Sequence, residues 1–393
     1  MLTKASASIA CSRVQTVCWR LSAWDPDIAS VRYRAAIPAS RLVDRGVASR
    51  FSAASYGVLE RSPPDAVVFV KAFGRRDVEL ARRAADARVP VVLDVCDNVF
   101  AAGYRAHSSD NLKRMAEVAA AVVTTGPALA DVLRAELGAD LPLHVVPDPA
   151  ETPDDVHAAA RIVLQQRLGR ALRERRADIP RALAGVVARG LVPAVRRSVP
   201  RTETTVLRQV LWFGNAGSVE PRFGIVNLAD IGGELEAAAR EVPFRLLVIT
   251  SDRSAYRQHI EPLALETAFA PWDRLTIFHY VRESEVVILP NSRDEFSICK
   301  SANRATLTLS QGVPVVATRI PSLDPLAGCV LFDDFQGGVV TYLRHRELAA
   351  DHVRRAAAVI ERGFAPEVVA ERWHRTLSAA RAAEALHQEG DMS

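Results

Sequence analysis

Short apolar runs alternate with segments of helical periodicity throughout the first 150 residues. The apolar runs are rich in β-branched residues and lie at Gln15–Leu21, Ala66–Val70, Val89–Val95, Ala121–Thr125 and His144–Pro147. The helical periods between them cover Val31–Arg45, Asp77–Ala87 and Asn111–Ala119, with another beginning near Pro127. Buried strands that alternate with amphipathic helices are typical of a parallel sheet covered on its faces. Residues 1–150 therefore predict one Rossmann-like βα domain.

The same alternation begins again near residue 206. Predicted strands lie at Val206–Phe213, Arg245–Thr250, Leu275–His279, Glu285–Leu289 and Val315–Ala317, and predicted helices lie at Leu228–Glu241 and Lys300–Gln311. Residues 206–347 therefore predict a second Rossmann-like domain, so the expected fold class is α/β with two such domains. Residues 348–393 predict C-terminal helices with a break at Gly363–Pro366.

Residues 151–205 differ in composition from both predicted domains. Between Val156 and Arg201 the chain has eleven arginines, no lysine, and only Glu174 and Asp178 as acidic residues. Apolar residues recur at helical spacing at Ala160, Val163, Leu164, Leu168, Ala171 and Leu172. The segment predicts a basic amphipathic helix in an insert between the domains. Two interpretations stay open: a solvated helix that packs on a neighbouring domain, and a helix that docks on anionic lipid.

Composition excludes several classes of protein. Hydrophobic residues make up 49% of the chain and charged residues 24%, as in globular proteins. The net charge of +4 is small for 393 residues, and no basic stripe is interleaved with aromatics, so nucleic-acid binding is not indicated. No apolar run approaches the roughly 20 residues that span a bilayer, and the first residues lack a signal-peptide pattern. We expect a cytoplasmic protein, at most peripheral to the inner face of the membrane through residues 156–201.

The cysteines give no sign of a disulfide framework or a metal site. They are five, an odd number, and no two of them form a CxxC pair. We therefore expect no bound metal.

Candidate binding residues follow the predicted strands of the second half. In open parallel sheets ligands bind outside the carboxyl ends of the strands. After the strand that ends at Phe213 come Gly214, Asn215, Gly217 and Ser218, whose backbone N–H groups can face a phosphate. Ser251 and Asn291 follow two further strands. A glycine-rich turn without a ligand fits the first cluster equally well.

A basic cluster opens the predicted helix at Lys300. Its polar members are Lys300, Ser301, Asn303 and Arg304. Lys300 and Arg304 are four residues apart and so share a helical face near the N-terminus, where cations are disfavoured unless an anion is bound. Lys300 is also one of only four lysines among 50 basic residues, which hints that an ammonium is required there. The alternative is two solvated side chains.

Candidate catalytic and substrate-binding residues also follow strands of the first half. Asp94, Asp97 and Asn98 lie at the end of one strand, Lys71 ends another, His107 lies further along, and Arg32 and Arg34 follow the first strand. A carboxylate here can accept the proton of an acceptor hydroxyl, and arginine or lysine can hold an acidic group. We predict Asp97 as the general base, with His107 as the second choice. Asp97 and Asn98 could instead only cap the following turn.

Several of these motifs resemble glycosyltransferases of the GT-B fold and of the family 4 type. In the second half the resemblance lies in FGNAGS, EVVILPN, KSANR and QGVPVVAT, and in the first half in ASVRYRAAIPASRL, VVLDVCDN and VVPD. The tail FAPEVVAERWHRTL resembles the C-terminal helices that cross back to the first domain in this family. The resemblance implies two domains that face a cleft, with an acceptor domain at 1–150 and a nucleotide-sugar donor domain at 206–347. It implies a nucleoside-diphosphate sugar as substrate and no further cofactor.

The chain departs from the family pattern at the donor site. Family 4 enzymes usually carry two glutamates with seven residues between them, and Cys299 and Leu307 stand at those places. The usual Arg and Lys after the first donor-domain strand are also absent, which leaves Asn215, Ser218 and Arg222. We expect Lys300 and Arg304 to supply the missing positive charge.

The leading hypothesis is a metal-independent glycosyltransferase that moves a sugar from a nucleoside diphosphate to a hydroxyl acceptor. The expected acceptor is a glycan or a lipid-linked glycan. The expected product is a cell-surface polysaccharide, glycolipid or glycoconjugate. A sugar-nucleotide epimerase of the same fold would bind the same donor without an acceptor. A catalytically inactive binding or scaffold protein is the third possibility.

Overall fold

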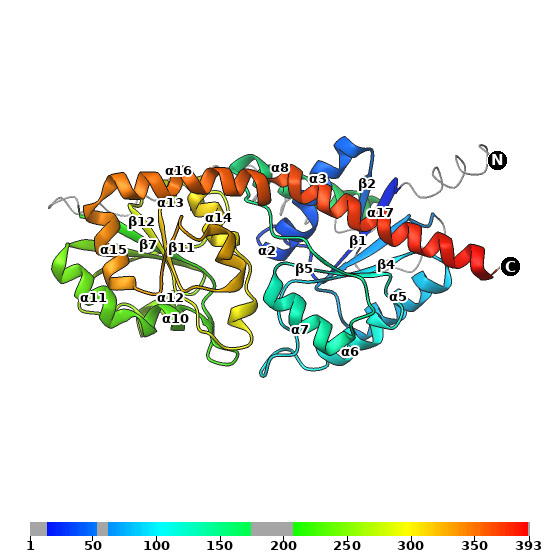
Figure 1. Cartoon of the computed structure of the whole chain (residues 1–393), viewed down its shortest axis with the longest axis horizontal. Coiled ribbons are helices and arrows are strands. Elements are labelled where there is room, and N and C mark those ends of the chain that lie inside the picture. The colour runs from blue at the N-terminus through cyan, green and yellow to red at the C-terminus, as the bar shows by residue number, and fades with distance from the viewer. Residues whose placement is uncertain (1–13, 53–61, 174–206, 392–393) are drawn as a thin grey trace. The chain divides into compact units, whose positions relative to one another are not determined.

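A computed structural model describes residues 14–52, 62–173 and 207–391 of the chain (Figure 1). Within these ranges the chain forms two compact units. The first unit contains residues 14–52, 62–100, 105–173 and 365–391, and the second contains residues 101–104 and 207–364. No helix in the described ranges combines the length and apolar character needed to cross a membrane.

The first unit is built on a six-stranded parallel sheet. Its strands are β1 (Thr16–Leu21), β2 (Ala48–Ser52), β3 (Ala66–Val70), β4 (Val91–Val95), β5 (Ala121–Thr124) and β6 (Leu143–Val145), in the order β2-β1-β3-β4-β5-β6. All residues of β3, β4 and β5 are buried, as expected of central strands covered by helices on both faces. Only β2, a short strand at the edge of the sheet, lies outside the predicted runs.

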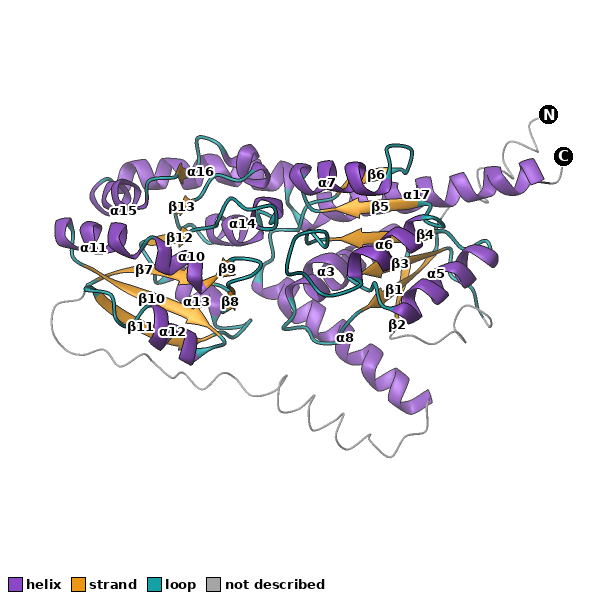
Figure 2. Cartoon of the chain, turned by 90° about the horizontal axis from the view of Figure 1, so that it is seen from below, coloured by secondary structure: helices purple, strands orange, loops and turns teal. Residues whose placement is uncertain are grey.

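Helices pack on both faces of this sheet (Figure 2). They are α2 (Ala29–Val31), the π-helical turn η1 (Arg32–Ala36), α3 (Ile37–Leu42), the 3-10 turn η2 (Val43–Arg45), α5 (Arg75–Asp86), α6 (Ser108–Ala116), α7 (Pro127–Leu137), α8 (Pro153–Arg173) and α17 (Pro366–Asp391). The C-terminal helix α17 packs along α3, and its Trp373 ring lies 5.2 Å from that of Trp19 on β1, edge to face. The last helix of the chain is thus part of the core of the first unit.

The helix predicted for the insert also belongs to this core. Val156, Ala159 and Val163 of α8 are at most 1% exposed and join the apolar cluster around β1 and α3. The apolar face of this part of α8 is therefore covered by protein and is not available to lipid. The rest of the predicted insert, from residue 174 to 205, lies outside the described residues.

The second unit repeats the six-stranded parallel sheet. Its strands are β7 (Arg208–Phe213), β10 (Phe244–Thr250), β11 (Glu266–Pro271), β12 (Val286–Leu289), β13 (Val315–Ala317) and β14 (Leu331–Phe332), in the order β11-β10-β7-β12-β13-β14. A two-stranded hairpin of β8 (Gly217–Ser218) and β9 (Phe223–Gly224) follows β7. Its helices are α10 (Ile225–Asp230), α11 (Gly232–Glu241), α12 (Arg253–His259), α13 (Ile277–Arg282), α14 (Asn303–Ser310), α15 (Phe335–Arg344) and α16 (Arg346–Gly363), with 3-10 turns η3 (Ser297–Cys299) and η4 (Pro321–Leu326).

Two features of this unit differ from the predictions. The strand predicted at Leu275–His279 is wrong, because Ile277, Phe278 and Val281 are buried on one face of α13. The edge strand is Glu266–Pro271, whose partly exposed residues give no continuous apolar run. In the C-terminal tail, the break at Gly363–Pro366 separates α16, which belongs to the second unit, from α17, which belongs to the first.

Candidate functional site

The order of strands locates a candidate site in the second unit. The chain passes from β7 outward to β10 and β11, and then returns to the other side of β7 to form β12, β13 and β14. Ligands of open α/β sheets bind at such a reversal, outside the carboxyl ends of the strands. Gly214 follows β7 at this point, and Asn291 follows β12. The strand order therefore places these two candidate binding residues after neighbouring strands of the same sheet.

Arg304, in the first turn of α14, joins the ends of these two strands. Its Nη1 donates to the carbonyl oxygen of Phe213 at 3.2 Å, and its Nη2 donates to Asn291 Oδ1 at 3.4 Å. No carboxylate of the described ranges forms an ion pair with it. Arg304 is partly buried, and this partial loss of water lowers its pKa to about 10, because the charged guanidinium has no counter-charge within the described residues. A bound anion at this place would supply that charge.

The glycine at the end of β7 allows the close approach of this guanidinium. A Cβ on Gly214 would lie 3.2 Å from Arg304 Nη1 and 3.0 Å from Cζ2 of the buried Trp212. The turn itself is not followed directly by a helix as predicted, since the β8–β9 hairpin comes before α10. Gly217 at φ 83° and Gly224 at φ 87° face each other across this hairpin. A Cβ on Gly217 would lie 1.9 Å from the carbonyl oxygen of Phe223, so the strands can approach only without one. Asn215 Oδ1 accepts from Gly217 N at 3.1 Å, while Ser218 Oγ donates to the carbonyl of Glu220 at 3.0 Å.

Lys300 occupies a different environment from Arg304. The helix begins only at Asn303, and Lys300 is an extended residue after η3, so the prediction that both cations share one helical face is wrong. The Lys300 ammonium lies 3.8 Å from the ring centroid of Phe296 and 5.2 Å from that of Phe223. Ser301 and Asn303 are half-buried in the turn that leads into the helix.

Other predicted charges of the donor site are engaged or absent. Arg222 is exposed and forms an ion pair with Asp230. Cys299 and Leu307, where family 4 glutamates would stand, are each 3% exposed and contribute no carboxylate. Ser251 is exposed after β10, next to Asp252, which caps α12 through its carboxylate.

In the first unit, Arg34 and Asp94 bind each other in the interior. Arg34 Nη2 lies 2.7 Å from Asp94 Oδ1, and Nη1 donates to the carbonyl of Val146 at 2.7 Å and to Asp148 at 3.1 Å. The side chains of Arg34 and Asp94 are 1% and 0% exposed. Burial opposes the charge of Arg34, but the two carboxylates keep its pKa above the ordinary value. The prediction that Arg34 and Asp94 bind substrate is therefore corrected: Arg34 fixes η1 to β4 through Asp94, and to the chain after β6 through Val146 and Asp148.

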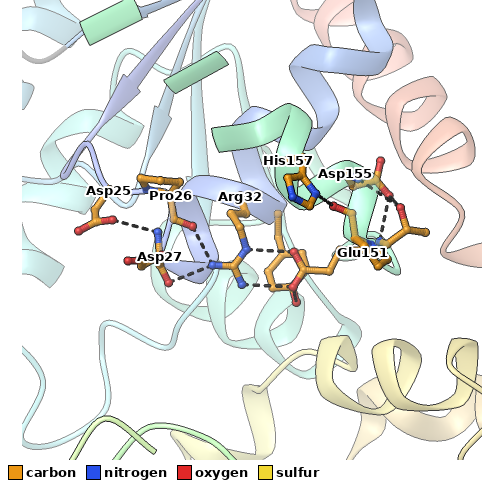
Figure 3. A network of polar contacts seen from close by, with 10 residues as sticks. Asp25, Pro26, Asp27, Arg32, Glu151, Asp155 and His157 are labelled. Atoms are coloured by element: carbon orange, nitrogen blue, oxygen red, sulfur yellow. Dashed lines mark hydrogen bonds and ion pairs between the residues drawn. The ribbon is translucent and has the colours of Figure 1, made fainter. Parts of the chain in front are cut away.

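Arg32 likewise binds groups within the protein, as Figure 3 shows. Its Nε and Nη2 donate to the two carboxylate oxygens of Glu151 at 3.0 and 3.2 Å, and its Nη1 donates to the carbonyls of Pro26 and Asp27 at 2.9 Å each. Tyr33 Oη donates to Glu151 at 2.5 Å. Arg32 is 3% exposed, so the prediction that it contacts substrate is corrected. Its role is to hold the loop after β1. Sequence reasoning missed Glu151 because its partner is 119 residues away.

The strand ends of β3 and β4 bring Lys71 and Asp97 together. The ammonium of Lys71 forms an ion pair with the carboxylate of Asp97, and both side chains are partly exposed, at 24% and 14%. Asn98 accepts from Phe100 N at 3.0 Å and is buried, so its side chain shapes the following turn. His107 is exposed just before α6. The predicted base thus lies at the sheet edge beside a predicted substrate-binding lysine.

Comparison with known proteins shows which fold carries these sites. No family model matches the chain, and no curated protein is similar to it in sequence. Among solved structures, HepE from Anabaena in complex with UDP matches with a TM-score of 0.59 at 14% identity, covering 92% of this chain and 99% of HepE. Sucrose-phosphate synthase from Thermosynechococcus elongatus matches with a TM-score of 0.61 at 13% identity, covering 94% and 100%. The chain has the GT-B fold.

A third solved structure supports the same architecture. A glycosyltransferase from Rickettsia africae covers 94% of this chain and 98% of its own, with a TM-score of 0.56 at 9% identity. The prediction of two Rossmann-like domains in a GT-B arrangement of elements is confirmed. Membership of family 4 stays a prediction.

Proposed function

We propose that this GT-B chain is a glycosyltransferase that binds a nucleoside-diphosphate sugar on its second unit and transfers the sugar to a hydroxyl acceptor on its first. The observation that carries the proposal is the partly buried guanidinium of Arg304 at the β7–β12 reversal, without an acidic partner among the described residues. A diphosphate supplies the negative charge that this position lacks. The structures of HepE with UDP and with UDP-glucose add support, since the same fold binds these ligands there.

The diphosphate is the leaving group of the proposed reaction. The bond between the anomeric carbon and the diphosphate oxygen breaks, and the acceptor oxygen forms a new bond to that carbon. Negative charge then grows on the diphosphate, and a fixed cation in a water-poor place stabilises it most effectively. We assign this role to Arg304, together with backbone N–H groups after Gly214 and at the start of α14. In this scheme the chemistry needs no metal ion.

The acceptor hydroxyl must lose its proton during transfer. We assign the role of proton acceptor to Asp97, whose carboxylate follows the end of β4 and is 14% exposed. This carboxylate forms an ion pair with the ammonium of Lys71, which ends β3. His107 is the alternative base. The identity of the acceptor, and the contact of residues 156–201 with anionic membrane, stay predictions.

Two experiments test the function. Calorimetric titration with UDP and UDP-glucose measures donor binding, and binding of either supports the site. Product analysis by mass spectrometry, with and without a mixture of cell-envelope glycans as acceptors, then separates the reactions. Glycosylated acceptor indicates a transferase, a changed sugar without acceptor indicates an epimerase, and binding without any product indicates a scaffold.

A further inference from the structure

Residues 101–104 come from the first half of the chain but belong to the second unit. The chain up to Phe100 and the chain from Arg105 onward both belong to the first unit. The four residues form a turn, in which Tyr104 N donates to the carbonyl oxygen of Ala101 at 3.2 Å. This 101–104 turn is thus a short excursion of the chain into the second unit.

The 101–104 turn contacts the loop between β12 and α14. The backbone N–H of Ala102 donates to Glu295 Oε1 at 2.7 Å. The ring centroid of Tyr104 lies 6.0 Å from that of Phe296, the next residue of the same loop. A hydrogen bond to a carboxylate is stronger than one between neutral groups, so the bond to Glu295 is a main attachment of the turn.

A second contact of the turn, with the β8–β9 hairpin, requires a glycine. Gly103 has φ 73°, a backbone conformation that other residues rarely adopt, and it lies against Glu220 between β8 and β9. A Cβ on Gly103 would lie 2.8 Å from Cγ of Glu220 and 3.0 Å from its carbonyl carbon. A larger residue at position 103 must therefore move the turn away from the hairpin.

The residues that hold the turn also border the candidate donor site. Phe296 is 4% exposed, and its ring centroid lies 5.3 Å from that of Phe223 on β9 and 3.8 Å from the Lys300 ammonium. The same ring contacts Tyr104 of the turn. The turn is therefore packed on the loops that follow β7 and β12, where we place the donor.

The chain between the turn and Asp97 is short and ordered. Asp97 precedes Ala101 by four positions, so their Cα atoms lie at most about 14 Å apart in any arrangement of the two units. Asn98 and Val99 are 2% and 3% exposed, and Asn98 Oδ1 accepts from Phe100 N at 3.0 Å. A turn that is fixed to the donor loops thus restricts where the carboxylate of Asp97 can lie.

We propose that the 101–104 turn positions Asp97 for the transfer by fixing the chain that carries it to the loops of the donor site. Glu295 and Gly103 are its positioning residues, since they act through Asp97 and not on the reacting atoms. A general base works only within hydrogen-bond reach of its proton, and small misplacements of reacting groups are costly. This inference rests on the proposed function, which it extends by assigning the element that places the base.

Hydrogen exchange of the full chain, followed by mass spectrometry, tests the turn without any substrate. Glu295→Ala should speed exchange of residues 101–104 about tenfold and also speed exchange of residues 97–100, and Glu295→Gln, which keeps an acceptor oxygen, should restore most of the protection. The matched control is Glu236→Ala, because Glu236 Oε1 accepts from Ala264 N at the same 2.7 Å elsewhere in the second unit. This control should leave both stretches unchanged. Exchange of 97–100 that is equal in Glu295→Ala and the parent overturns the proposal.

Reaction rates separate positioning from a purely structural role. With UDP-glucose and the glycan mixture, Gly103→Ala and Glu295→Ala should lower kcat about tenfold or more and leave UDP affinity unchanged. Gly328→Ala is the control, since Gly328 has φ 78° but a Cβ there would have its nearest neighbour at 3.9 Å. Parent-like kcat in both turn variants, or the same loss in Gly328→Ala, contradicts the proposal. A parent chain that forms no product while the exchange results hold counts against the transferase and not against the turn.

Discussion

Arg304 on α14 donates a hydrogen bond of 3.2 Å from Nη1 to the carbonyl oxygen of Phe213, the last residue of β7. The guanidinium is thus oriented by a neutral group, and its charge is not neutralised by any carboxylate of the described residues. This arrangement distinguishes Arg304 from the buried arginines of the first unit, which all pair with acids, as Arg34 does with Asp94. An arginine oriented but not neutralised is suited to a charged ligand.

Gly214→Ala should weaken UDP binding about tenfold. The added Cβ would lie 3.2 Å from Arg304 Nη1 and 3.0 Å from the Trp212 ring, so the guanidinium must move. Overpacking of this kind costs about 1–3 kcal/mol of stability as well. Calorimetry and urea unfolding measure the two effects. The control is Gly233→Ala on α11, where a Cβ meets nothing within 4 Å, and it should leave UDP affinity unchanged.

Asp97→Asn should lower turnover by about a hundredfold or more, which is the usual contribution of a general base. Donor affinity should not change, since the carboxylate belongs to the first unit. Initial rates with a saturating donor and UDP titrations check both statements. If Asp97→Asn reacts like the parent while His107→Ala is inactive, the base is His107, and full activity in both variants contradicts the assignment.

Arg34→Met should destabilise the first unit by about 3–5 kcal/mol, because it leaves the buried Asp94 carboxylate without its main partner. The double variant Arg34→Met/Asp94→Leu should lose less, since the buried Asp94 charge is removed together with its partner. Urea unfolding measures both. The exposed pair Arg354–Asp351 provides the control, and Arg354→Ala should cost at most about 1 kcal/mol. A loss for Arg34→Met as small as for this control would contradict an internal role.

The second unit should lose stability as the pH falls below about 6.5. Burial, with a smaller effect of Arg355, lowers the pKa of His352 below its ordinary value of 6.5, and its Nδ1 lies 2.8 Å from Tyr342 Oη. The unfolded chain then binds a proton that the folded chain does not, so this contribution is present above pH 6.5 and is lost as the pH falls through the lowered pKa. Its slope is at most about 1.4 kcal/mol per pH unit. Unfolding of His352→Asn should depend less steeply on pH, and an unchanged slope would contradict the assignment.

The sequence predicts the fold more completely than the site, for a physical reason. The central strands are continuous apolar runs, so the runs at 66–70 and 286–289 identify them directly. Edge strands such as Glu266–Pro271 are partly exposed and leave no such run. The short run Leu275–His279 predicts a strand, but Ile277 and Phe278 within it lie on the buried face of α13.

Site residues depend on contacts between distant parts of the chain. Arg32 and Arg34 follow a strand as ligand-binding residues do, but Glu151, Asp94 and Asp148 complete their coordination inside the protein. The local sequence does not indicate those partners, which lie 60 or more residues away along the chain. The prediction of Arg304 as a donor-site residue rests on local sequence alone, because a cation in the first turn of a helix conflicts with the helix dipole.

The most direct test of the account is the affinity of UDP for the parent chain and for Arg304→Ala, measured by calorimetry at one salt concentration. We predict that the parent binds UDP and that the variant loses about 1.5–3 kcal/mol of binding free energy, as for hydrogen bonds to charged groups. Arg319→Ala is the matched control, since Arg319 follows the neighbouring β13 and is paired with Asp324. Its affinity should equal that of the parent. Equal UDP affinity in Arg304→Ala and the parent, or no UDP binding by the parent, would contradict the donor site at the β7–β12 reversal.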